Sequence, residues 1–181
     1  VFLTNPFRQI VYCNQPFRKM VRPELQEGIF GLRPGEVLGC VHAHEMDGGC
    51  GCARSCRHCG AALAILKSLQ GEELCKECHL QITDGKSLRS LDLQILSRPF
   101  WIDDELYSLN TAFDISHERK VFAQNRTFLH NMINAAGGME ALLEMLQSED
   151  NKDEVPLSKL HQCTLSMLHE VLCQYDSVAA E

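Results

Sequence analysis

The chain has 181 residues, of which 45% are hydrophobic, so it is long enough to bury one core and carry a helical appendage. Its formal net charge is −7, which argues against a nucleic-acid-binding surface because phosphate binding needs a basic face. No apolar run approaches the roughly 20 residues that cross a bilayer, and the start has no signal-peptide pattern. We therefore expect a cytoplasmic chain without a membrane segment, beginning at Val1 as though cut from a longer protein.

The first third of the chain predicts a strand and a short helix, followed by a region poor in apolar residues. Apolar and polar residues alternate over residues 9–14, as in a strand, and residues 16–21 favour a short helix. Residues 28–39 are rich in turn formers. Apolar residues then stay sparse from Leu38 to Gly60.

A helix and three strands are predicted next. Apolar spacing favours a helix over residues 61–69, stopped by Gly71. Three strand candidates follow, separated by turns at Asp84-Gly85 and Asp103-Asp104: residues 74–82, 90–101 and 106–115.

The last third predicts two amphipathic helices. Apolar residues spaced three and four apart run from Ile115 to Leu146 and form a heptad seam, which implies pairing with another helix. Residues 148–153 read as a charged loop, and Pro156 suits the first turn of a second helix, whose apolar face continues to Tyr175. Two such hairpins make a four-helix bundle, so we expect a parallel homodimer.

The cysteines predict a metal site. Of ten cysteines, seven lie between Cys40 and Cys78, several as CxxC pairs. In a reducing cytosol this clustering indicates metal chelation better than disulfides. Four thiolates about 2.3 Å from one ion would fasten a loop that otherwise lacks a core.

The spacing alone leaves the ligand set and the metal open. Cys40, Cys56 and Cys59 leave Cys50 or Cys52 as the fourth ligand. Zinc and an iron–sulfur cluster both accept four thiolates. Zinc is favoured because a metal that stabilises a short ligand loop is the simpler need, and the cluster is the alternative. Whether three further residues contribute ligands also stays open: His42, Cys75 and Cys78.

Two stretches resemble the start and the end of a PAS domain. Residues 10–14 (IVYCN), followed by Phe17, resemble its opening strand and first helical turn, and residues 113–120 (FDISHERK) resemble its exit. The resemblance implies an α+β fold, with a PAS-like antiparallel sheet and short helices over residues 1–115. Residues 116–181 would then be a helical linker and a dimerisation and phosphoacceptor hairpin.

The cysteine region resembles a cysteine-bearing PAS subfamily found before histidine kinase helices. The matching segments are residues 38–43 (LGCVHA), 49–51 (GCG) and 56–61 (CRHCGA). In that subfamily the cysteine of the Gly-Cys-Gly turn recurs, so the resemblance selects Cys50 over Cys52. The implied metal ligands are Cys40, Cys50, Cys56 and Cys59.

Residues 128–138 (FLHNMINAAGG) resemble the phosphoacceptor helix of a two-component sensor histidine kinase, with His130 as the phosphoacceptor. Asn131 stands where that family usually has Asp or Glu to orient and deprotonate the ring. Because an amide cannot act as a base, we expect slow or absent phosphorylation. Asn134 matches the Thr or Asn that holds the water hydrolysing a partner's aspartyl phosphate, which favours retained phosphatase function.

The resemblance implies a sensor fragment of a histidine kinase, in which a metal-bearing PAS domain controls His130 and the partner is a response regulator receiver domain. The chain has no glycine-rich box that could hold ATP, so it is not a kinase without a separate ATP-binding domain. The alternative is a non-catalytic metal-binding dimerisation module. A zinc-ribbon nucleic-acid binder is disfavoured because only Arg54 and Arg57 lie among the cysteines.

Overall fold

The computed structural model describes residues 1–83, 87–147 and 157–179. These residues form two compact units, Val1–His117 and Glu118–Glu181. The predicted turn at Asp84-Gly85, the charged loop at 148–153 and the helix start at Pro156 lie outside the described residues. Within the described part of the chain, none of the helices combines the length and the apolar character needed to cross a membrane.

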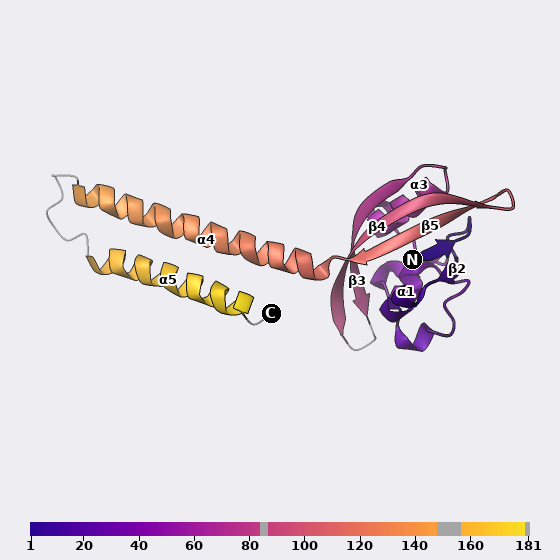
Figure 1. Ribbon diagram of the computed structural model, residues 1–181, viewed down its shortest axis with the longest axis horizontal. Helices are drawn as coiled ribbons and strands as arrows, with labels where there is room; N and C mark the ends of the chain where they lie inside the picture. The colour runs from indigo at the N-terminus through magenta and orange to yellow at the C-terminus, as the bar shows by residue number, and fades with distance from the viewer. Residues whose placement is uncertain (84–86, 148–156, 180–181) are drawn as a thin grey trace. The chain divides into compact units, whose positions relative to one another are not determined.

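The first unit is an α+β fold built on one antiparallel sheet, which confirms the predicted class and is consistent with a PAS-like fold (Figure 1). The sheet has five strands in the order β2-β1-β5-β4-β3. Every neighbouring pair is antiparallel. The strands are β1 (Phe2–Thr4), β2 (Ile10–Cys13), β3 (Leu74–Thr83), β4 (Leu88–Ile102) and β5 (Glu105–Asp114).

Two elements differ from the sequence prediction. Strand β1 was not predicted, because three residues are too few to show alternation. It lies between β2 and β5 and joins the edge strand β2 to the rest of the sheet. The stretch expected to be turns contains the helix α2 (Pro34–Leu38). This helix starts at a proline, which fits the first turn of a helix, and ends at Gly39 with φ of 80°.

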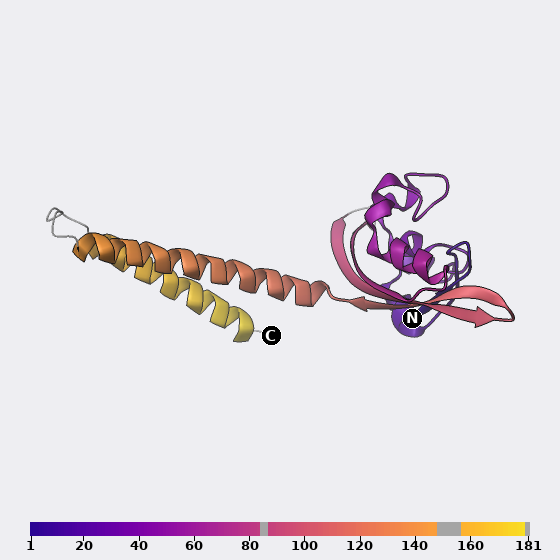
Figure 2. The same ribbon diagram turned by 90° about the horizontal axis from the view of Figure 1, so that it is seen from above.

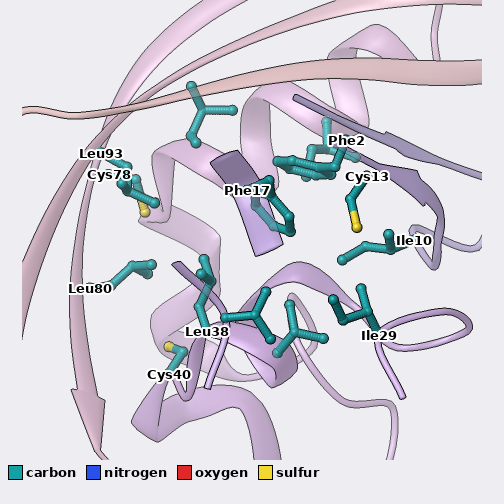
Figure 3. Close-up of a cluster of buried hydrophobic side chains, with 14 of the residues drawn as sticks. Phe2, Ile10, Cys13, Phe17, Ile29, Leu38, Cys40, Cys78, Leu80 and Leu93 are labelled. Atoms are coloured by element: carbon teal, nitrogen blue, oxygen red, sulfur yellow. The ribbon is translucent and has the colours of Figure 1, made fainter. Parts of the chain in front are cut away.

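Short helices cover one side of the curved sheet (Figure 2). Besides α2 they are α1 (Gln15–Met20), α3 (Gly60–Ser68) and three 3-10 turns, η1 (Pro23–Leu25), η2 (Val41–His44) and η3 (Arg54–His58). The core lies between them and the sheet. It joins β1 to α1, where the ring centroids of Phe2 and Phe17 lie 4.4 Å apart (Figure 3).

A buried polar network fastens α3 to the sheet. The Asn110 side chain on β5 is fully buried and accepts hydrogen bonds at Oδ1 from Ser97 Oγ at 2.6 Å and Ser108 Oγ at 2.9 Å. Ser68, at the end of α3, donates to Ser108 at 2.7 Å. The Asn110 amide also donates to the Ser108 carbonyl oxygen at 2.8 Å and lies 3.5 Å from Thr4 Oγ1. These groups satisfy one another where water has no access.

The second unit contains the two predicted helices, α4 (Ser116–Gln147) and α5 (Leu157–Ala179). The side chain of Asn131 on α4 donates to Glu170 on α5, and Thr164 on α5 lies 3.6 Å from the Met139 sulfur on α4. The two helices therefore pack as a hairpin in which polar side chains also meet.

We expect Asn110→Ala to lower the free energy of unfolding of the first unit by about 2–4 kcal/mol, because it removes a side chain shared by several buried hydroxyls. Denaturant unfolding of the full chain measures this change. Thr111→Ala is the control, since the neighbouring strand position faces the other side of the sheet and should cost less than about 1 kcal/mol. Equal losses for the two variants would contradict a structural role for the network.

Candidate metal centre

The four cysteines predicted as ligands line one cavity of about 40 Å³ in the first unit. Each comes from a different place in the chain between α2 and α3. Cys40 follows α2, Cys50 lies in the loop between η2 and η3, Cys56 is in η3, and Cys59 is the residue from which α3 starts. The rest of the lining is mostly apolar and includes Ala43, Ile65 and Leu80.

Backbone turns bring these sulfurs to the cavity. Gly39 ends α2 in the left-handed region, and its carbonyl oxygen accepts from the Thr83 amide at 2.9 Å, which sets Cys40 beside Ile82 of β3. Gly49 and Gly51 have φ of 74° and 87° on either side of Cys50. Side chains other than glycine rarely adopt such φ values, so the Gly-Cys-Gly turn depends on both glycines.

The backbone of Cys50 is held against the start of α2. Its amide donates to Glu36 Oε1 at 3.1 Å, and its carbonyl oxygen accepts from the Arg33 guanidinium at 3.1 Å. Gly35 leaves room for the thiol, since a Cβ at that position would lie 2.5 Å from Cys50 Sγ. The position of this sulfur therefore depends on a glycine outside the cysteine motif.

The surroundings keep two of the thiols protonated unless a cation enters. Burial raises the pKa of Cys50 to about 12, and burial also raises the pKa of Cys40, with a smaller contribution from neighbouring cysteines. An uncompensated thiolate is costly in an apolar cavity, whereas a bound cation compensates its charge and releases the proton. Soft sulfur donors around a small space fit zinc or an iron–sulfur cluster.

The thiols share the cavity without forming a closed coordination shell. Among the described residues, no group of three or more His, Cys, Asp or Glu side chains is already arranged to hold a metal ion. A bound ion would have to draw the sulfurs inward to about 2.3 Å. The small cavity between them provides the space for that movement.

The remaining residues that the sequence left open lie in different places. Cys52 is exposed, with its sulfur 3.2 Å from Arg33 Nη1 and 3.5 Å from Arg8 Nη2, and these guanidinium groups lower its pKa. Cys75 is exposed on β3. The His42 ring is hydrogen-bonded through Nδ1 to Glu45, a residue that also accepts from Ser55 at 3.3 Å and so joins η2 to η3.

Cys78 is the remaining residue whose role as a ligand the sequence left open. It is buried, and its sulfur lies 3.4 Å from that of Cys59. The hydrogen bond between the two thiols lowers the pKa of Cys59 and raises that of Cys78, because the pair readily gives up its first proton and holds the second. The alternation of Cys78 with Leu80 could have placed this cysteine on the inner face of β3 and Cys75 on the outer face.

In the second unit, the structure brings His130 and Asn134 together on α4. The Asn134 amide nitrogen lies 3.1 Å from His130 Nε2, and both residues are exposed. Asn131 instead points to Glu170 of α5. Successive helical side chains diverge by about 100°, so the amide next to the histidine and the amide one turn later face different surroundings.

No protein-family model matches this chain, and no curated protein matches it.

We expect Gly35→Ala to push the Cys50 side chain out of the cavity and to destabilise the first unit by about 1–3 kcal/mol, the usual cost of overpacking. Denaturant unfolding gives the stability change, and mass spectrometry of alkylated protein gives the labelling rate of Cys50, which should rise. Gly28→Ala is the matched control, because a Cβ there has no neighbour within 4 Å. Slow Cys50 labelling in both variants would refute the role given to Gly35.

Proposed function

We propose that this chain is the sensor fragment of a two-component histidine kinase, in which a metal-bearing PAS-like unit controls the phosphoacceptor His130. The observation that carries the proposal is the exposed imidazole of His130, with Asn134 at 3.1 Å, on a helix that starts directly after the last strand of the sheet unit. A phosphoacceptor must be reachable by a kinase domain, and an exposed helical position meets that need.

The three polar residues of α4 have separate roles in this proposal. His130 receives a phosphoryl group from the ATP-binding domain of a histidine kinase. Asn131 lacks a carboxylate and cannot deprotonate the ring, which makes phosphorylation slow. Asn134 positions the water that hydrolyses the aspartyl phosphate of a response regulator receiver domain. Its contact with Nε2 places this amide directly at the histidine.

The proposal includes a homodimer formed through the hairpin of α4 and α5. The helix α4 exposes large apolar side chains, with exposed fractions of 72% for Phe122, 58% for Leu129 and 69% for Ile133. The helix α5 exposes a second apolar set: Leu165, Leu168, Val171 and Leu172. A second copy of the hairpin would bury both sets in a four-helix bundle.

In this proposal the cavity lined by thiols holds the metal of the sensor unit. Zinc held by Cys40, Cys50, Cys56 and Cys59 would be a structural clip, and it is favoured over an iron–sulfur cluster, which would make the unit a redox or oxygen sensor. The visible absorption spectrum of anaerobically purified protein separates them, because only the cluster absorbs there.

Hydrogen bonds from β4 fix the start of α4 within the first unit. The Asp92 amide donates to Ser116 Oγ at 2.9 Å, and the Asp92 carbonyl oxygen accepts from the Ile115 amide at 2.9 Å. These bonds hold the first residues of α4 against the sheet, so a change in the sheet unit alters how α4 begins and, through it, the packing of the hairpin. A non-catalytic metal-binding dimerisation module is the second candidate, since the cavity and the exposed apolar sets would serve it equally well.

Incubation with a separate histidine kinase ATP-binding domain and labelled ATP tests the phosphoacceptor. We expect slow labelling that His130→Gln abolishes and that His161→Gln, an exposed histidine on α5, leaves unchanged. Asn131→Glu combined with Glu170→Gln should speed labelling by about 10²-fold, because it adds a base without a like charge opposite. Labelling that survives His130→Gln would remove this residue from the proposal.

Hydrolysis of a phosphorylated receiver domain tests Asn134. Asn134→Ala should slow hydrolysis by about 10²-fold, as expected when a group that positions the attacking water is removed. Gln124→Ala, an exposed polar position on the same helix, is the control and should hydrolyse at the wild-type rate. If the chain neither accepts label on His130 nor accelerates hydrolysis, the dimerisation module becomes the better reading.

Light scattering after size exclusion tests the dimer. We expect a dimer for the wild type and a monomer for Phe122→Lys combined with Ile133→Lys, because two charges would be buried without partners. Gln124→Lys, which changes a polar exposed position of α4, should remain dimeric. A monomeric wild type would contradict the bundle.

A further inference from the structure

We propose that Cys78 is a metal ligand, so that strand β3 of the sheet takes part in the thiolate centre together with Cys59. This inference rests on the metal centre of the proposed function. It adds a thiol that neither the cysteine spacing nor the Gly-Cys-Gly resemblance selects. The first reason is position, since Cys78 is 3% exposed and its sulfur lies 3.4 Å from that of Cys59.

The distance between the two sulfurs fits two ligands of one metal ion and not a disulfide bond. Sulfurs bound tetrahedrally at about 2.3 Å from one ion lie about 3.8 Å apart. The two sulfurs of a disulfide lie only about 2.05 Å apart. At 3.4 Å, Cys59 and Cys78 already have nearly the spacing of one edge of a metal tetrathiolate. An ion could therefore bind both with a movement of a few tenths of an ångström.

The start of α3 and the strand β3 hold these two thiols next to each other. Cys59 begins α3, and the next residue is Gly60, where a Cβ would overlap the Glu77 carbonyl group. The absence of that Cβ lets the start of α3 lie against the β3 backbone one residue before Cys78. On the edge strand β3, Cys78 pairs with Leu93 near the middle of the ladder between β3 and β4, so its position is fixed by the strand register.

The other three thiols line the cavity that Cys59 also lines. Cys40 is joined to β3 by its pairing with Ile82, four residues after Cys78, and it lines the cavity together with Cys59. Figure 3 shows the Cys40 and Cys78 sulfurs on the same side of β3, with Leu80 between them. With Cys50 and Cys56 the centre has five thiols for the four positions of a tetrahedral ion. Cys59 and Cys78 form the fixed pair, and the remaining positions are filled from Cys40, Cys50 and Cys56.

Titration of the full chain with Co²⁺ under anaerobic conditions tests the assignment, because cobalt replaces zinc and its visible spectrum reports thiolate ligation. We expect Cys78→Ser to weaken Co²⁺ binding by at least about tenfold, since changes even to outer-shell partners of metal ligands cost that much. Cys75→Ser is the matched control on the same strand and should bind Co²⁺ like the wild type. Far-UV circular dichroism of the metal-free variants shows whether each is folded, and Cys78→Ala replaces Cys78→Ser if the latter is not.

The outcomes separate this inference from the function on which it rests. Unchanged Co²⁺ affinity and an unchanged spectrum in folded Cys78→Ser would overturn the role of Cys78 and leave the four-cysteine site standing. A wild type that binds neither Co²⁺ nor zinc and contains no iron would remove the metal centre itself. Loss of affinity in Cys78→Ser and not in Cys75→Ser supports the assignment.

Discussion

Cysteine sulfurs form part of the core of the first unit, where Cys13, Cys40 and Cys78 are buried. The chain between α2 and α3 must cover one end of the sheet, yet its most buried residues are small: Cys40, Ala43, Ala53 and Cys56. Their combined apolar area is modest, so hydrophobic burial alone holds this segment weakly. A cation shared by several thiols would supply the missing cohesion, because ligand bonds join segments that packing leaves loosely held. Binding of a cation would thus raise the stability of the first unit.

Sequence patterns predicted the elements that are long enough to show a period. The strands β3, β4 and β5 and the helices α3 and α4 show clear alternation or heptad spacing, and their bounds were predicted within two residues. The three residues of β1 carry no such pattern and are held by pairing with β2 and β5. The helix α2 was not predicted, because its proline and glycine are equally typical of a turn.

In the candidate site too, local patterns predicted one part and tertiary packing decided the rest. The spacing predicted that Cys40, Cys56 and Cys59 lie together, and the resemblance added Cys50 in place of Cys52; all four line one cavity. The proximity of Cys59 and Cys78 could not be predicted, since it depends on the packing of α3 against a strand nineteen residues later in the chain. That packing is a tertiary event, set by Gly60 and by the strand register, for which no local pattern exists.

The helix α3 is anchored at both ends. Its first end carries Cys59, and its last residue, Ser68, bonds to Ser108 of β5 in the buried network. Nine helical residues span about 14 Å and do not compress under the small forces of ligand exchange. A sulfur displaced at the first end would therefore be coupled, through a rigid helix, to the buried network on β5, the strand that leads into α4.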